Sequence, residues 1–232
     1  MLLLCWSLNA VAADPLPCTP HDLGFGGPAK WTHVPLSRLK NDTVYAVEQL
    51  DSGPTLRASA DNSASMFITR LDPAIGSDAT LSWRWETDAL IPGADNQDRR
   101  REDAPLRVIL AFDGDRTRLP TADQNELRGA SLLLGHEAPY ATLMYIWSDK
   151  VPVGTVIPSA HTTRVKMIVA ASGPQGLGQW QSVRKDLAAD FKRAFGEAPG
   201  PLMGIGLMTD TDNTGAKATG RYADVRLTCT GG

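Results

Sequence analysis

The sequence predicts an all-β protein: an antiparallel β-sandwich of jelly-roll type, with one or two short helices. Short apolar or alternating runs of strand length recur along the chain, and its 21 Gly and 16 Pro are spread between them. Many short strands joined by turn residues are typical of sandwiches and jelly rolls. No internal repeat, low-complexity tract or linker divides the 232 residues. Residues 14–232 are therefore predicted to form one domain.

Ten segments have the length and apolar pattern of β-strands. In chain order they are 43–50, 55–60, 65–71, 80–87, 106–113, 141–148, 164–171, 179–185, 203–210 and 219–228.

Two further segments predict helices. Thr121–Leu134 is rich in helix-forming residues and begins with a residue that can cap it. Residues 186–195 form the clearer helix: Asp186 can cap its start, apolar residues recur on one face, and Gly196 ends it.

The N-terminus predicts export. Residues 1–13 carry no charge, contain an apolar run and end in small residues before Asp14 and Pro15, as a signal peptide does before its cleavage site. A basic start is missing, which places the true start codon upstream; the alternative is an N-terminal core strand. The stretch is too short to span a bilayer. We therefore expect a periplasmic or secreted protein with no membrane span.

The cysteines agree with export. Of the three, Cys5 belongs to the signal peptide, and Cys18 and Cys229 remain near the two ends of the chain. An even count in an oxidising compartment predicts a disulfide between them. The alternative is two unrelated buried thiols.

Charge excludes one class of partner. The formal net charge is -3, whereas nucleic-acid-binding domains carry a clustered basic surplus. We therefore expect no nucleic acid partner.

The strand at 80–87 carries two kinds of side chain. Period-two alternation places Trp83 and Trp85 on one face and Arg84 and Glu86 on the other. The tryptophans suit a core. Arg84 and Glu86 then either pair with other charges outside the core or line a ligand-binding face.

Arg107 is the most conspicuous charge in a predicted strand. It shares its face with Ile109 and Ala111, so its guanidinium needs a partner or a ligand. Asp103 and Glu86 are the candidate partners.

Tyr145 and Trp147 share one face of their predicted strand. Such flat aromatic rings either pack in the core or form platforms for sugar rings.

The segment 210–215 follows an apolar strand and alternates oxygen-bearing side chains, including Asp210, Asp212 and Asn213. Asp210 and Asp212 resemble the first ligands of a calcium loop, but Arg221 stands where an EF-hand has its bidentate Glu. The alternative is a hairpin turn in which Gly215 takes positive φ.

Two neighbouring features bear on a site. Gly204 and Gly206 share one face of their strand, where a second backbone or a ligand can approach closely. The run 99–101 of three Arg is most simply a solvated loop. It could also cover an anionic ligand, although Glu102 and Asp103 offset much of its field.

Several of these residues also occur in a pattern that resembles bacterial domain-of-unknown-function family 3047. The likeness runs in order over most of the chain after residue 13, and the motif at 208–215 is its most specific part. The matching residues are Leu81 to Trp85, Asp103, Pro105, Arg107, Val108, Phe112, Tyr145, Trp147, Ser148, Trp180, Val183, Arg184, Asp186, Phe195, Gly196, Met208 to Gly215, Tyr222 and Asp224. The resemblance implies an exported bacterial sandwich protein and brings no established activity.

The function predicted first is a binding module for a carbohydrate or similar polar ligand of the cell envelope. Its site would combine the polar residues with the aromatic platforms: Arg84, Glu86, Asp103, Arg107, Tyr145, Trp147, Asp210, Asp212 and Asn213.

Two alternatives stay open. A polysaccharide hydrolase or lyase needs only paired carboxylates, for which Glu86, Asp103 and Asp210 are candidates; no nucleophile-elbow, phosphate-loop or dinucleotide motif points to another chemistry. A structural or assembly protein needs no small-molecule site.

Overall fold

The computed structural model describes residues 16–37, 39–134, 137–160 and 162–229. The predicted signal peptide and Cys5 lie outside these residues.

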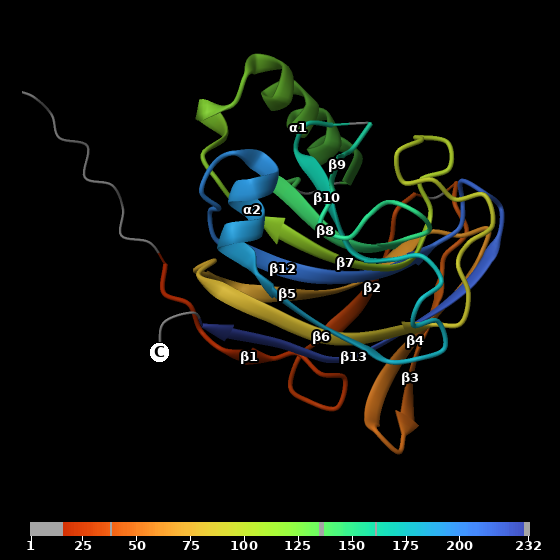
Figure 1. The fold of residues 1–232 in the computed structure, drawn as a ribbon. Coiled ribbons are helices and arrows are strands. Elements are labelled where there is room, and N and C mark those ends of the chain that lie inside the picture. The colour runs from red at the N-terminus through yellow and green to blue at the C-terminus, as the bar shows by residue number, and fades with distance from the viewer. Residues whose placement is uncertain (1–15, 38, 135–136, 161, 230–232) are drawn as a thin grey trace, which may run out of the picture.

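Two β-sheets lie one above the other and form a sandwich (Figure 1). Sheet A has the order β11-β6-β13-β4-β3, with β1 paired to β13. Its strands are β1 (His21–Asp22), β3 (Val44–Leu50), β4 (Gly53–Asp61), β6 (Ala79–Thr87), β11 (Gln181–Asp186) and β13 (Lys217–Cys229).

Sheet B has the order β2-β5-β12-β7-β8-β10-β9. Its strands are β2 (Trp31–Pro35), β5 (Ser65–Ile75), β7 (Ala104–Phe112), β8 (Ala141–Ser148), β9 (Val156–Pro158), β10 (Val165–Ser172) and β12 (Leu202–Asp210). The all-β, jelly-roll-like sandwich is therefore confirmed. One of its strand pairs is parallel, β8 with β10, because the segment between them crosses over and inserts β9 beyond β10.

The core lies between the inner faces of the two sheets. Alternate residues of β6 and β7 point into it, among them Trp83 and Trp85 from sheet A and Leu106 from sheet B. The predicted alternation of these strands is confirmed, since Trp83 and Trp85 are almost completely buried. Their rings pack on aromatic residues of β8 in the opposite sheet.

Both predicted helices are present. They are α1 (Thr121–Leu134) and α2 (Leu187–Phe195), and a short 3-10 helix, η1 (Arg116–Arg118), precedes α1. The Asp186 carboxylate caps α2 by accepting from Ala189 N at 2.9 Å, and Gly196 ends the helix with a left-handed φ of 77°. Within the described ranges, neither helix has the length and apolar character needed to span a bilayer.

Three short strands escape sequence-based prediction. β1 and β9 contain two and three residues, too few for alternation to be visible. β2 lies between a Gly- and Pro-rich stretch and its own terminal Pro35, which marks the segment as a loop.

The predicted disulfide is present. Cys18 and Cys229 are bonded across 211 residues of sequence, with their Cα atoms 5.7 Å apart. Cys229 ends β13, and the segment after Cys18 pairs with the same strand through β1. The bond therefore holds the N-terminal segment against the last strand of sheet A.

Replacing both cysteines by Ser should lower the free energy of unfolding by about 2 to 5 kcal/mol, because the bond restricts a very long loop in the unfolded chain. Urea titration of the double variant against the wild type measures the loss. Wild type reduced with dithiothreitol is the control and should behave like the variant. An unchanged urea midpoint in both would contradict the stabilising role.

Candidate functional site

A groove of about 560 Å³ lies on the face of sheet B that points away from the core. Its floor is apolar, and neighbouring strands supply it: Met66 from β5, Met208 from β12, Ile109 from β7 and Met144 from β8. Ile109 is directly paired with Met144 across the two strands. These side chains form a cluster separate from the main core. Sheet B therefore carries apolar residues on both faces.

The end of the floor is closed by a buried ion pair between β7 and β12. Arg107 Nε donates to Asp210 Oδ1 at 2.7 Å, and Arg107 Nη2 donates to Asp210 Oδ2 at 3.1 Å. Nη2 also donates to the Glu102 carbonyl oxygen, and Nη1 contacts the Met167 sulfur. The two side chains are only 3% and 5% exposed. The partner of Arg107 is therefore Asp210, and the prediction that Asp103 or Glu86 pairs with Arg107 is wrong.

Burial changes the pKa of Asp210. Removal of the carboxylate from water raises the pKa of Asp210 to about 6, although the Arg107 guanidinium opposes the rise. A group with this pKa changes its protonation near neutral pH, in contact with the groove.

Asp103, next to β7, holds the loop between β12 and β13. Its Oδ1 accepts from Asn213 N at 3.1 Å, and its Oδ2 accepts from Thr214 N at 2.7 Å and Thr214 Oγ1 at 2.6 Å. Gly215 has a φ of 70°. The predicted positive φ of Gly215 is confirmed, but the hairpin is wrong, because β12 belongs to sheet B and β13 to sheet A. The loop is a turn between the two sheets, and Asp103 anchors it.

Asp212 lies at the mouth of the groove, where Lys40 Nζ is 2.5 Å from its Oδ2. Carboxylate oxygens of Asp103, Asp210 and Asp212 lie within 4.8 Å of one another and could hold a metal ion. Calcium takes six to eight oxygen ligands, yet the oxygens here already accept from Lys40, Arg107 and backbone N–H groups. Calcium at Asp210 and Asp212 stays a prediction, and it requires these cations to move.

Arg84 and Glu86 do not join this cluster. They project from the outer face of sheet A, on the other side of the core. Arg84 Nε is 2.5 Å from Asp224 Oδ2, and its guanidinium lies 5.0 Å from the Trp180 ring centre. Glu86 faces Arg221 at 3.9 Å. Their interpretation as outward-facing ion pairs is confirmed, and the expectation that they share a face with Arg107 is wrong.

Tyr145 and Trp147 are completely buried between the sheets. The Tyr145 hydroxyl donates to Asp190 Oδ2 at 2.9 Å, and Trp147 Nε1 donates to the Gly173 carbonyl oxygen at 3.0 Å. They serve the core, as their alternative interpretation held, and offer no accessible ring to a sugar. Their inward direction follows from the same alternation that points Met144 into the groove.

Sequence reasoning missed the apolar floor and Lys40. A signal was available, because Met66, Met144 and Met208 occupy outward positions where a one-sided sheet would carry polar residues. Gly204 and Gly206 proved to serve packing: a Cβ on Gly204 would lie 2.8 Å from the Thr69 carbonyl oxygen, and one on Gly206 would meet Ile68 and Ile109.

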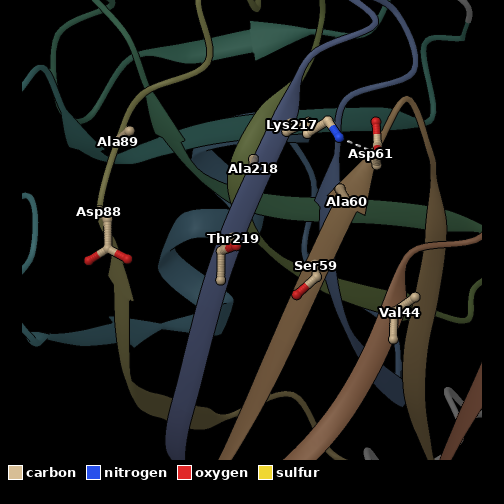
Figure 2. A pocket seen from close by; sticks show the side chains of 9 residues that line it. All are labelled: Val44, Ser59, Ala60, Asp61, Asp88, Ala89, Lys217, Ala218 and Thr219. Carbon is tan, nitrogen blue, oxygen red and sulfur yellow. Dashed lines mark ion pairs between the residues drawn. The ribbon is translucent and has the colours of Figure 1, made fainter.

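A second hollow, of about 470 Å³, lies on the outer face of sheet A (Figure 2). Lys217 and Asp61 form an ion pair of 2.7 Å at its edge, and Ser59 and Thr219 lie beside it on β4 and β13. This pair is mostly exposed to solvent, so its contribution is small. The hollow on sheet A is used as a control surface for the groove on sheet B.

The fold and the groove define a class: a β-sandwich protein with a ligand-sized groove on the outer face of sheet B. The model of the family described as "Protein of unknown function (DUF3047)" matches residues 29–226, and the chain belongs to this family. The resemblance inferred from the motifs is thus confirmed. No curated protein matched the chain.

Solved structures with a similar fold include carbohydrate-active proteins. A family 30 carbohydrate-binding module of a cellulosomal cellulase from Clostridium thermocellum is 12% identical, with a TM-score of 0.40, over 93% of this chain and 96% of that one. The xyloglucanase domain of NopAA from Sinorhizobium fredii is 9% identical, with a TM-score of 0.37, over 93% and 100%.

A family 12 xyloglucanase from Bacillus licheniformis is 7% identical, with a TM-score of 0.37, over 86% of this chain and 99% of that one. Similarity of this size supports no argument about what the chain binds. The ligand of the chain is inferred from the groove itself.

Arg107→Met should lower the free energy of unfolding by about 3 to 5 kcal/mol, because it leaves the Asp210 carboxylate buried without its partner. Urea titration measures the loss. The double variant Arg107→Met/Asp210→Leu removes both charges and should recover most of it. Arg99→Met, on the exposed rim, is the control and should change the value by less than about 0.5 kcal/mol. Equal losses in the single and double variants would contradict a role for the ion pair.

The raised pKa of Asp210 predicts how stability depends on pH. Native Asp210 binds a proton near pH 6, whereas an unfolded Asp binds one near its ordinary pKa of about 3.9. Acidification from about pH 7.5 to about pH 5 should therefore stabilise the wild type, relative to Asp210→Asn, by about 1 kcal/mol. Urea titrations of both proteins across this range measure the difference. Relative destabilisation on acidification would show that Arg107 outweighs burial.

Proposed function

We propose that this chain is an exported binding module of the cell envelope, and that a carbohydrate or similar polar ligand occupies the groove on sheet B. The observation that carries the proposal is the pairing of an apolar floor with a polar end in one open hollow. C–H faces of a sugar can lie on Met208, Ile109 and Met144, while hydroxyls bond the charged rim. The disulfide supports an oxidising compartment, in the periplasm or outside the cell.

The same geometry favours a purely structural role less than a binding role. The polar side chains at the end of the groove are satisfied within the protein, since Asp210 pairs with Arg107 and Asp212 with Lys40. A structural protein would need nothing further. The groove beside these pairs nevertheless lies open and is large enough for a small ligand.

A hydrolase or lyase also receives less support. Of its three candidate carboxylates, Glu86 lies on sheet A, Asp103 is engaged by the backbone of the β12–β13 loop, and Asp210 is engaged by Arg107. A retaining or inverting glycosidase needs one carboxyl group to protonate the leaving group and another free to act as nucleophile or base. Binding without cleavage is therefore the function proposed.

Isothermal titration against a panel of neutral and acidic oligosaccharides tests the proposal. At least one saccharide should bind the wild type, and Met144→Trp should weaken that binding at least about tenfold, because its larger ring fills the floor. The matched control is Val44→Trp, which fills the hollow on sheet A instead and should leave binding unchanged.

Chromatography of the incubated saccharides should show no cleavage products. No binding by the wild type to any member of the panel would sink the proposal. Products formed by the wild type and absent with Asp210→Asn would favour the enzyme instead.

A further inference from the structure

The charged side chains that line the groove do not cancel. Four cations line it, Lys40, Arg99, Arg100 and Arg107, against three carboxylates, Glu102, Asp210 and Asp212. The groove therefore has an excess of positive charge, whereas the whole chain has a formal net charge of -3. A cation in this lining that has no carboxylate partner attracts an anionic ligand.

The excess is one charge, which remains when Arg99 and Arg100 at the rim are set against Glu102. Arg107 and Lys40 are neutralised by Asp210 and Asp212. Arg99 is exposed and forms no ion pair with any residue that the structure describes. Arg100 only approaches Asp98, at 4.0 Å, and its side chain is 89% exposed. Both guanidinium groups are thus available to a ligand.

Arg101, the third arginine of the run 99–101, differs from Arg99 and Arg100 because it is engaged by two carboxylates. Arg101 Nε lies 3.0 Å from Asp98 Oδ2, and Arg101 Nη2 lies 3.7 Å from Asp95 Oδ2. Lys150 also pairs with Asp95, at 3.0 Å. Asp95 and Asp98 are thus engaged by Arg101 and Lys150. Of the carboxylates that line the groove, this leaves Glu102 beside Arg99 and Arg100.

The backbone that carries these two arginines is held in place. Arg101 N donates to the Asp98 carbonyl oxygen at 2.8 Å, and Asp95 N donates to the Arg101 carbonyl oxygen at 2.7 Å. Asn96, which is buried, donates from its amide to the Asp103 carbonyl oxygen at 2.9 Å. An ordered loop presents its side chains at a smaller entropic cost on binding than a flexible one.

We propose that the ligand of the groove is an acidic saccharide, an oligosaccharide of uronate residues, whose carboxylates bind Arg99 and Arg100. This inference rests on the proposed function and names its ligand class. Guanidinium groups bind carboxylates through two parallel hydrogen bonds. The ring C–H faces of the saccharide lie on Met208, Ile109 and Met144. Arg99 and Arg100 then cover an anion, which was the second interpretation of the run 99–101.

Titration calorimetry with matched saccharides tests the inference. The probes are the trimers of galacturonate, mannuronate and glucuronate, each as the free acid and as the methyl ester, so that the members of a pair differ in charge and by one methyl group per residue. At about 20 mM salt, at least one acid should bind about tenfold more tightly than its ester. Because the arginines are exposed, about 300 mM salt should remove most of that preference.

The double variant Arg99→Gln/Arg100→Gln should lose the preference for the acid while its urea midpoint stays unchanged. The matched control is Arg184→Gln/Arg226→Gln, which removes two exposed arginines from sheet A and should keep the preference.

Each remaining outcome has a distinct meaning. Equal binding of an acid and its ester, or binding only of neutral saccharides from the wider panel, would overturn the inference and leave the binding function standing. Binding of no saccharide would overturn both. A preference that survives in the Arg99→Gln/Arg100→Gln variant would place the anion elsewhere.

Discussion

The ion pair between Arg107 and Asp210 is the interaction on which the site depends. It joins β7 to β12 at the end of the groove, where both side chains have lost nearly all contact with water. Burial of two charges is costly unless their geometry is good and their remaining hydrogen bonds are satisfied. Both conditions are met here, because the guanidinium makes two bonds to the carboxylate and a further bond to the Glu102 backbone. The pair therefore fixes where the chain enters β7.

A second carboxylate, that of Asp103, holds the β12–β13 loop in the same region. Asp103 follows Glu102 and accepts three hydrogen bonds from Asn213 and Thr214. The loop in turn presents Asp212 to Lys40, from the segment before β3. Three segments distant in the sequence thus meet at one end of sheet B, and they meet through charges held in defined positions.

The groove exists because sheet B is apolar on both faces. Its inner face builds the core with sheet A. On its outer face, Val151 from the loop before β9 packs with residues of the sheet itself, among them Ile146 and Ile157. Met144 packs against this cluster and, with Met208 and Ile109, lines the open part of the face. Sheet A is different: Arg84 and Glu86 on its outer face pair with neighbouring charges. The two outer faces therefore have different chemistry within one sandwich.

Most of the fold could be predicted because its signals are local. Period-two alternation located most strands of both sheets, Asp186 and Gly196 marked the ends of α2, and the two cysteines after the predicted signal segment left one pairing. The site could be predicted only in part. Five predicted residues do come together, because all lie in or close to β7 and β12, which the fold pairs, and all carry polar groups that must be satisfied. They are Asp103, Arg107, Asp210, Asp212 and Asn213.

The sequence by itself determined which face of its own strand each residue occupies, because backbone geometry alternates side chains without reference to the rest of the chain. Only the tertiary structure decided which sheet a strand joins and which face of that sheet is covered. Glu86 and Arg107 alternate with core residues in the same way, yet they point to opposite sides of the sandwich. Strand alternation points Tyr145 and Met144 to opposite faces of β8. The packing of distant segments then buried Tyr145 in the core and left Met144 in an open groove.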